Sequence, residues 1–396
     1  MLSVVLASLG ILCASAVAAL AAIRSDRAAL ALGIGGAALS CAVGAAASIR
    51  ALLAGEKSAI RLAWPLPVGE AHVGLDALSA FFLLCVFVVS GLAAVYGGGY
   101  LRASAGGRRL APALFFFDLL VASMGLVAVA RDGVLFLVAW EVMSIASFFL
   151  VTFDDERPEV RRAGMTYLIA SQVGVVFLFV LFALLARSGS YDFDRLGGVG
   201  AAPFLLALAG FGTKAGFWPA HVWLPDAHPA APSPVSAVMS GVMIKMGIYG
   251  LLRTLTFLGP PPPGWGAALV VVGVVSGLAG VLHALGQHDL KRLLAYHSVE
   301  NIGIIALGIG IGLLGRSRGN ATVALLGFAG ALLHVLNHGL FKGLLFEGAG
   351  SVLHGAGTRE IDSLGGLQRR MPVTALTFLA GSIAICGLPP LNGFVS

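Results

Sequence analysis

Residues Phe211 to Arg253 read FGTKAGFWPAHVWLPDAHPAAPSPVSAVMSGVMIKMGIYGLLR. This stretch places Lys214 and Lys245 inside apolar segments and separates them by a break rich in proline and histidine. A lipid bilayer penalises charged side chains, and it tolerates non-helical backbone only where that backbone is buried in protein or lines a water-filled space. The stretch therefore predicts a membrane-embedded helix bundle with a functional interruption.

The composition of the whole chain agrees with a polytopic membrane protein. Of the 396 residues, 58% are hydrophobic and 11% are charged, and the mean hydropathy is +0.94. Soluble domains carry about 25% charged residues, so a water-soluble globule is excluded. Apolar runs of about 20 residues recur along the chain, which is the length that crosses a bilayer as a helix. Because no strand pattern is recognisable, the predicted fold class is all-α, a polytopic transmembrane helical bundle.

Hydropathy predicts about twelve membrane segments. They lie near residues 2–23, 28–49, 75–97, 112–130, 133–152, 163–186, 201–218, 233–257, 266–286, 298–314, 321–346 and 373–394. The seventh segment runs into Trp218-Pro219, and the twelfth contains GLPPLNG at 387–393, so both are expected to be broken. We expect N-terminal transmembrane helices at 1–100 and two inverted five-helix repeats at 110–257 and 266–396. The second repeat is expected to be incomplete at its C-terminus. Such broken, repeated helices are typical of transporters.

The distribution of cations predicts the orientation in the membrane. One set of loops carries thirteen lysines and arginines: Arg24, Arg27, Arg102, Arg108, Arg109, Arg157, Arg161, Arg162, Lys291, Arg292, Arg359, Arg369 and Arg370. The alternate loops carry nine: Arg50, Lys57, Arg61, Arg131, Arg187, Arg195, Arg253, Arg316 and Arg318. The positive-inside rule puts the first set in the cytoplasm and the N-terminus outside. Only Lys214, Lys245 and Lys342 are left within membrane segments on this assignment.

Glu141 has at least seven uncharged residues on each side, so a buried carboxylate is predicted there. A carboxylate near a buried lysine favours its charged form, and Glu141 is the candidate counter-ion of Lys214. The approach or withdrawal of Glu141 would then let Lys214 bind or release a proton. Lys214 is four residues from the break, which leaves open a lysine that snorkels at a helix end. Lys245 lies deeper in its segment.

His334, His338 and Lys342 are spaced i, i+4, i+8 in LLHVLNHGLFKGLLF. This spacing puts all three on one face of a helix, with about 6 Å of rise per step. Side chains and one or two waters bridge such a distance, and histidine titrates near neutral pH, so the face is predicted to relay protons. The two histidines could instead bind a metal, but no third ligand at suitable spacing completes that site.

His221, Asp226 and His228 belong to the break and are candidates for lining a water inlet. No other chemistry is indicated. The four cysteines have no metal-binding spacing, no glycine-rich phosphate loop follows a strand, and the net charge of +6 is spread over loops. The sequence therefore predicts no cofactor, no metal, no catalytic centre and no nucleic-acid partner.

Several long motifs resemble one family. They are KAGFWPAHVWLPDAHPAAPSPVSAVMSGVMIKMGIYGLLR at 214–253, LKRLLAYHSVENIGI at 290–304, LNHGLFKGLLFEGAGSVLH at 336–354, and MPVTALTFLAG with GLPPLNGFVS near the end. They resemble the proton-conducting antiporter-type membrane subunits of respiratory complex I, multisubunit Na⁺/H⁺ antiporters and membrane-bound hydrogenases. The resemblance covers roughly residues 75 to 396 and is strongest to the large membrane subunits of hydrogenase 4 and formate hydrogenlyase.

The resemblance implies a proton-translocating subunit of a hydrogenase 4-like oxidoreductase complex in a bacterial or archaeal cytoplasmic membrane. Its partners would be membrane and peripheral subunits that carry out electron transfer. The family's ionisable positions match, in order along the chain, Glu141, Lys214, Lys245, His334, His338 and Lys342. The alternatives are a subunit of a multisubunit Na⁺/H⁺ antiporter and a non-conducting membrane scaffold. The family also has an ionisable lysine or glutamate directly after the GFVS-like stretch, and that position is expected to follow Ser396.

Overall fold

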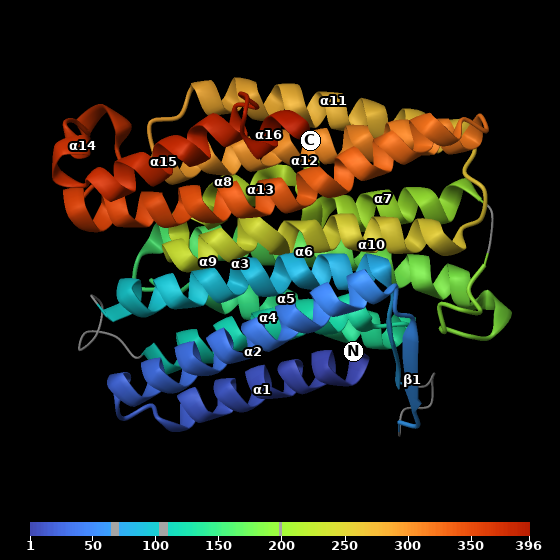
Figure 1. Ribbon diagram of the computed structural model, residues 1–396, viewed down its shortest axis with the longest axis horizontal. Coiled ribbons are helices and arrows are strands. Elements are labelled where there is room, and N and C mark those ends of the chain that lie inside the picture. The colour runs from blue at the N-terminus through green and yellow to red at the C-terminus, as the bar shows by residue number, and fades with distance from the viewer. Residues whose placement is uncertain (65–70, 103–109, 198–199) are drawn as a thin grey trace.

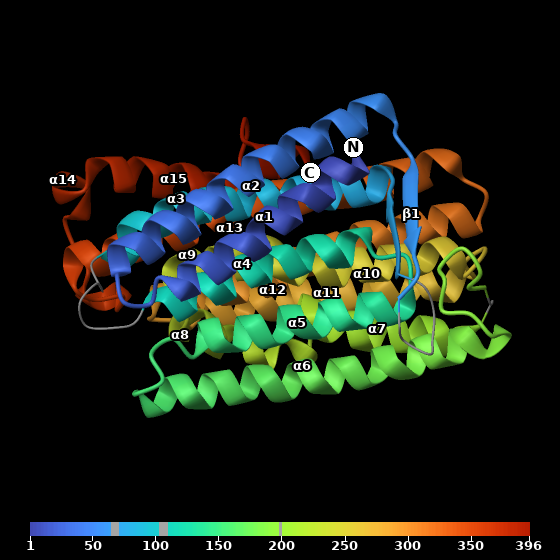
Figure 2. The same ribbon diagram turned by 90° about the horizontal axis from the view of Figure 1, so that it is seen from below.

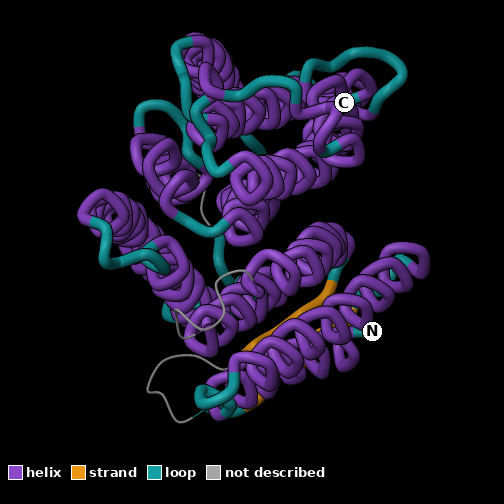
Figure 3. The backbone as a smooth tube through the Cα atoms, turned by 90° about the vertical axis from the view of Figure 1, so that its left-hand side faces the viewer, coloured by secondary structure: helices purple, strands orange, loops and turns teal. Residues whose placement is uncertain are grey.

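The computed structural model describes residues 1–64, 71–102, 110–197 and 200–396. Its helices run side by side along the long axis of the molecule, with the N-terminal helices at one edge and the C-terminal helices at the other (Figure 1). In the view turned by 90°, the helices are seen obliquely as foreshortened coils that slant in similar directions (Figure 3). The predicted all-α fold class is confirmed. Arg108 and Arg109, which the orientation argument used, lie outside the described residues.

Ten spans within the described chain are long and apolar enough to cross a membrane. They are α1 (Leu2–Ala21), α2 (Asp26–Ala54), α3 (Ala77–Arg102), α4 (Leu110–Val129), α5 (Gly133–Val151), α6 (Pro158–Leu185), the composite Ser233–Phe257, α11 (Pro263–Leu285), α12 (Leu290–Ser317) and α13 (Ala321–Ala356). The composite span consists of α9 (Ser233–Val238), the π-helical η3 (Met239–Met243) and α10 (Ile244–Phe257). Two shorter helices, α7 (Ala201–Ala215) and α15 (Pro372–Ile385), coincide with the remaining predicted segments. All twelve predicted segments are thus helical.

Both predicted breaks are confirmed. After α7 the chain turns at Gly216, whose φ of 85° is in the left-handed region, and continues through η2 (Ala220–Trp223) and α8 (Leu224–Ala230). After α15 the chain turns at Gly387 and resumes in α16 (Asn392–Val395). The other short helices are η1 (Ala186–Ser188), η4 (Ile361–Ser363) and α14 (Leu367–Arg370).

Within the described residues, the expectation of no strands is wrong at one place. β1 (Ser58–Leu62) and β2 (Ala71–Leu75) form an antiparallel pair at one end of the bundle, with Ile60 opposite Val73 (Figure 1). The two strands contain five residues each, and β1 is mostly exposed whereas β2 is mostly buried. The sequence of β1, SAIRL, lacks the strict alternation of polar and apolar residues by which a strand is recognised.

Local sequence explains where many helices start and how two of them pack. Asp132, Asp289 and Asn320 cap α5, α12 and α13 by accepting hydrogen bonds from first-turn amides. α11 and α12 approach closely at Gly273 and Gly303. The backbones are so near that a Cβ on Gly273 would lie 2.7 Å from the Gly303 carbonyl oxygen. Small residues permit this packing in membranes.

The exposed surface of α6 is suited to lipid. α6 lies along one edge of the molecule (Figure 2), and its exposed large side chains are Met165, Ile169, Val173, Val176, Phe177, Phe179 and Val180. An apolar face of this length is unfavourable in water and favourable against acyl chains. Together with the ten candidate spans, it supports a multi-pass membrane protein.

Candidate functional site

Lys214 lies in the last turn of α7, directly before the break, and its side chain is buried. The Nζ atom donates hydrogen bonds to the hydroxyls of Ser144 at 2.8 Å and Tyr167 at 3.1 Å, and it lies 3.5 Å from the hydroxyl of Ser171. These acceptors belong to α5 and α6. The ammonium group is therefore held by neutral hydroxyls inside the bundle, which differs from a lysine that snorkels to the surface.

Glu141 does not touch Lys214 in this structure. One of its carboxylate oxygens accepts a hydrogen bond from Gln172 at 3.1 Å, and the other is buried without a hydrogen-bond partner among the described residues. Ser144, which accepts a hydrogen bond from Lys214, lies three residues after Glu141 on α5. Glu141 and this partner of the lysine are therefore within one turn of the same helix. The counter-ion role of Glu141 stays a prediction.

Lys214 and the three hydroxyls around it, those of Ser144, Tyr167 and Ser171, form the Lys214 cluster. Met243 lies between this cluster and Lys245. Its sulfur accepts a hydrogen bond from Ser147 at 3.0 Å and lies 3.9 Å from the hydroxyl of Tyr167, the residue that also binds Lys214. Met243 is the last residue of the π-helical turn, and such turns are frequent at functional sites. Because a thioether does not carry a proton, Met243 interrupts the polar groups between the two lysines.

Lys245 and Lys342 bond to residues that are themselves hydrogen-bonded between helices. The Nζ atom of Lys245 donates to the Ser240 carbonyl, and the hydroxyls of Ser240 and Ser298 are 2.8 Å apart. Ser298 in turn donates to the Leu294 carbonyl at 3.0 Å, and the same carbonyl accepts from Nζ of Lys342. The structure thus brings two of the predicted lysines into one buried network, although they are far apart in the sequence.

His334, His338 and Lys342 lie on one face of α13, as their spacing predicts. The rings of His334 and His338 are stacked with centroids 6.2 Å apart. The two ring nitrogens of His334 lie 2.9 Å from the Ser396 hydroxyl and 3.0 Å from the amide oxygen of Asn301. Both ring nitrogens of His338 are buried without a hydrogen-bond partner among the described residues. A buried imidazole left in this state is a place where an internal water fits.

The break loop contributes residues of two kinds. His228 is fully buried, stacks on Phe346 of α13 with centroids 4.7 Å apart, and has no hydrogen-bond partner for either ring nitrogen among the described residues. It therefore lies within one turn of Lys342 along α13. His221 is near the rings of His283 and Tyr296, and Asp226 forms an ion pair with Arg292 at 3.2 Å. Of the three predicted inlet residues, only His228 reaches the α13 face.

The assignment of Lys291 to a loop is wrong. It lies in the first turn of α12 and is only 1% exposed, and its Nζ donates to the Ala231 carbonyl at 2.7 Å. Hydropathy missed it because it stands beside the exposed Arg292 and only four residues from the loop residue Gln287. Arg131 and Arg253 were also placed in loops, yet each is only 7% exposed.

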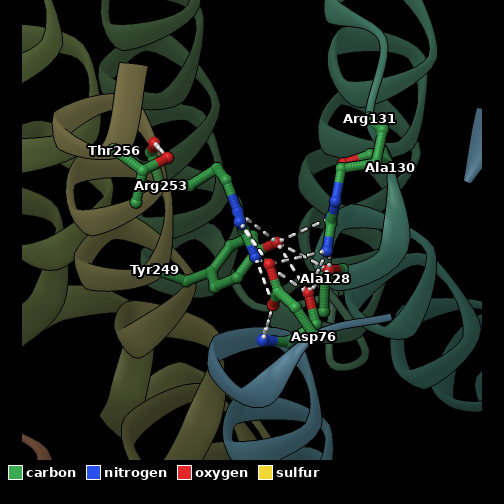
Figure 4. Close-up of polar contacts among 8 residues, drawn as sticks. Asp76, Ala128, Ala130, Arg131, Tyr249, Arg253 and Thr256 are labelled. Atoms are coloured by element: carbon green, nitrogen blue, oxygen red, sulfur yellow. Dashed lines mark hydrogen bonds and ion pairs between the residues drawn. The ribbon is translucent and has the colours of Figure 1, made fainter. Parts of the chain in front are cut away.

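Arg131 and Arg253 meet at Asp76, which precedes α3 (Figure 4). Arg253 forms two hydrogen bonds with this carboxylate, and Arg131 lies 3.4 Å from it. Both guanidinium groups also donate to the hydroxyls of Tyr249 and Ser79. Lys245, Tyr249 and Arg253 are spaced i, i+4, i+8 on α10. This spacing puts Arg253 on the same helix face as the buried Lys245, and it is the sequence signal from which its burial could have been predicted.

One cluster within the described chain offers three metal ligands within 4.8 Å of one another, namely His72, Asp192 and Asp194. The guanidinium of Arg61 lies 2.8 Å from Asp192 and 3.2 Å from Asp194, and His72 lies 3.0 Å from Asp192. Arg61 already pairs with both carboxylates, so the cluster is an ion-pair network that joins β1 and β2 to the loop before α7.

Comparisons with known proteins agree with this architecture. The profile of the family described as "NADH:quinone oxidoreductase/Mrp antiporter, TM" matches residues 130–396. Hydrogenase-4 component B of Escherichia coli is 41% identical over 355 residues, which are 87% of this chain and 52% of that protein. Formate hydrogenlyase subunit 3 of Escherichia coli is 38% identical over 284 residues, which are 70% of this chain and 46% of that protein.

The fold also matches a solved structure. A chain in the Mrp complex from Dietzia sp. DQ12-45-1b superimposes with a TM-score of 0.84 and 28% identity, covering 99% of this chain and 42% of that chain. The chain spans about half the length of the curated relatives it matches.

Proposed function

The chain belongs to the NADH:quinone oxidoreductase/Mrp antiporter transmembrane family, and from this premise we propose that it is a proton-translocating membrane subunit. The complex would be a respiratory-type oxidoreductase of the hydrogenase 4 or formate hydrogenlyase kind, as the similarity to hydrogenase-4 component B suggests. Electron transfer would take place in partner subunits, and this chain would hold no redox or catalytic centre of its own.

The buried lysines carry the proposal. Lys214, Lys245 and Lys342 are all buried in the bundle, and none forms an ion pair with a carboxylate within 4 Å among the described residues. A charged group that is buried without a counter-ion is costly for stability, so its presence favours a function. Lysine is suited to proton transfer because burial changes its proton affinity readily.

The proposed route has two parts. Glu141 and Lys214 would sense a conformational or electrostatic signal, and Lys245, Lys342, His338 and His334 would relay the proton. The hydroxyls of Ser240 and Ser298, which lie between the carbonyls that hold Lys245 and Lys342, support the second part, and water would have to connect each lysine to them. Met243 separates the two parts, so we propose that transfer between them requires Met243 to move or water to enter.

The topology is proposed on the same basis. Residues 110–257 and 266–396 would form the two inverted repeats, since each contains a broken helix in its fourth segment. The N-terminus would lie outside. When the buried residues Lys291, Arg131 and Arg253 are left out of the two counts of loop cations, twelve remain on one side and seven on the other, so the positive-inside rule still gives the same orientation.

A subunit of a multisubunit Na⁺/H⁺ antiporter is the second candidate, and the fold similarity to a chain of the Mrp complex favours it. The two candidates differ in what drives transport. Proton movement that requires turnover of a hydrogenase supports the first, whereas sodium-driven proton movement without electron transfer supports the second.

The test of a conducting role is Lys214→Ala in the assembled complex, with proton pumping and electron transfer measured together. We expect pumping to be lost or strongly reduced while the complex still assembles. Lys57→Ala is the matched control, because Lys57 is exposed between α2 and β1. Undiminished pumping at normal turnover in Lys214→Ala would instead support a non-conducting scaffold.

A further inference from the structure

A cavity of about 430 Å³ lies beside α8, and four arginines line it. Arg157 and Arg162 come from the start of α6, Arg292 from the first turn of α12, and Arg359 from the segment that follows α13. The cavity therefore collects cations from three parts of the chain at the same end of the bundle.

The arginines differ in how their charge is balanced. Arg157 pairs with Glu159 at 2.7 Å, and Arg292 pairs with Asp226 at 3.2 Å. Arg359 lies 3.2 Å from Asp289 and donates to the carbonyl of Pro229 at 2.7 Å. The side chain of Arg162, in contrast, forms no hydrogen bond or ion pair within the described parts of the chain.

Carboxylates balance only part of the charge of this cavity. Glu159, Asp226 and Asp289 pair with Arg157, Arg292 and Arg359, so Arg162 is the lining arginine whose charge has no carboxylate partner among the described residues. Guanidinium groups bind phosphate oxygens through paired N–H donors, and this geometry is more selective than a point charge. The volume also falls within the range of sites that bind small molecules. The cavity is thus suited to an anion with several oxygen acceptors.

The position of the cavity agrees with such a ligand. It lies where the lipid-facing helix α6 begins, and its lining also includes the apolar residues Val160, Ala163, Pro225 and Ala230. Basic pockets between membrane helices on the cytoplasmic side are a recurrent form of binding site for anionic headgroups. Pro225, Asp226 and Pro229 belong to α8, so an occupant would contact the break itself.

We propose that this cavity is a binding site for a phosphate-bearing anion, held by Arg162, Arg292 and Arg359. The phosphate belongs either to a lipid headgroup or to a free phosphate, and both present the same oxygens to the arginines. Binding does not depend on whether the chain conducts protons.

The test uses the complex that contains this chain, purified in a neutral detergent and freed of lipid. Binding is measured for inorganic phosphate, and for phosphatidylglycerol in mixed micelles with phosphatidylcholine as the comparison. We expect Arg162→Gln/Arg292→Gln to raise the dissociation constant of the binding probe by up to about a hundredfold, because it removes two arginines and each charge-assisted hydrogen bond lost is worth roughly tenfold. Phosphate binding identifies a free anion as ligand, and selective phosphatidylglycerol binding identifies a headgroup.

Two further variants make the result decisive. Arg316→Gln/Arg318→Gln removes two arginines at the opposite end of α12 and is expected to leave binding unchanged. Arg162→Gln alone breaks no contact within the described structure and is expected to weaken binding severalfold even if the double variant fails to fold. The proposal is overturned if neither probe binds, if both double variants weaken binding equally, or if a cross-linker at Arg162→Cys captures another subunit in place of lipid.

Discussion

Arg253 holds Asp76 with both arms of its guanidinium, through hydrogen bonds of 2.7 and 2.8 Å to the two carboxylate oxygens. The two residues are 177 positions apart in the sequence, and their pairing fastens the start of α3 to α10. Arg131 joins them from the turn between α4 and α5, so three segments meet at one carboxylate. The cluster lies at the same end of the bundle as β1 and β2.

Asp76→Asn is expected to destabilise the protein. The substitution leaves two arginines, each 7% exposed, without their shared counter-ion, and breaking a buried pair in this way costs on the order of 3 kcal/mol. A lower thermal midpoint in detergent measures the effect. Asp194→Asn is the control, because that carboxylate is largely exposed and should change the midpoint little. An equal midpoint for both variants would show that the cluster contributes no stability.

The same pair predicts how stability depends on pH. Burial raises the pKa of Asp76, but the hydrogen bonds and charge of Arg253 and the charge of Arg131 outweigh it and hold this pKa well below its usual range. A carboxylate with a depressed pKa stabilises the fold above its unfolded pKa of about 4 and loses that contribution as the pH falls through the folded value. We therefore expect the difference in midpoint between the wild type and Asp76→Asn to stay constant from pH 7 to about pH 5.

Below about pH 4 that difference should shrink, because Asp76 of the unfolded chain then takes up a proton and the unfolded state is stabilised, while the folded protein keeps the carboxylate ionised until a lower pH. Thermal unfolding over a pH series measures it. A difference that disappears already near pH 6 would contradict the depressed pKa.

The hydropathy pattern predicted the twelve segments and both breaks, since apolar length and proline act locally along the chain. It could not predict the partners of Lys214. Ser144 and Tyr167 belong to other helices, and their hydroxyls reach the lysine only when those helices pack together. Lys291 and Arg253 were misplaced for a related reason. Both stand near the ends of helices, where a sequence does not distinguish an exposed cation from one that packs against another segment.

Tyr167→Phe is expected to lower proton pumping severalfold without loss of assembly. The change removes one of the hydroxyls that accept hydrogen bonds from Lys214 and keeps the ring that packs beside Trp223. Protons pumped per electron pair are the measurement. Tyr191→Phe, in the loop before α7, serves as the control for removal of a tyrosine hydroxyl. If Tyr167→Phe pumps like this control, the Lys214 cluster takes no part in transfer.

Substitutions of Met243 test the interruption between Lys214 and Lys245. Met243→Ser leaves a space bordered by the hydroxyls of Ser147 and Tyr167, and a polar space of this kind admits water. We expect a raised passive proton conductance of vesicles that contain the complex, without turnover. Met243→Leu keeps the volume and stays apolar, so it should conduct like the wild type. Equal conductance of the serine and leucine variants would show that Met243 is not the barrier.

Lys291 and Lys245 are both buried, and their contacts predict opposite consequences when each is replaced by methionine. Nζ of Lys291 donates to the carbonyl of Ala231, 60 residues away, and so fastens the end of α8 to α12. Lys245 donates to the carbonyl of Ser240, only five residues earlier in its own span, so this hydrogen bond does not connect two separate helices. Lys291→Met should therefore cost on the order of 1–3 kcal/mol, because the Ala231 carbonyl loses its charged donor.

Lys291→Met should leave proton pumping per assembled complex unchanged. Lys245→Met, in contrast, should abolish pumping. Its stability should be kept or improved, because a buried charge is replaced by an apolar side chain of similar length. Thermal midpoints and pumping ratios of the two variants, measured side by side, separate the roles. Loss of pumping in a fully assembled Lys291→Met complex would place Lys291 on the proton route, and burial would then outweigh the pattern of contacts as a guide to function.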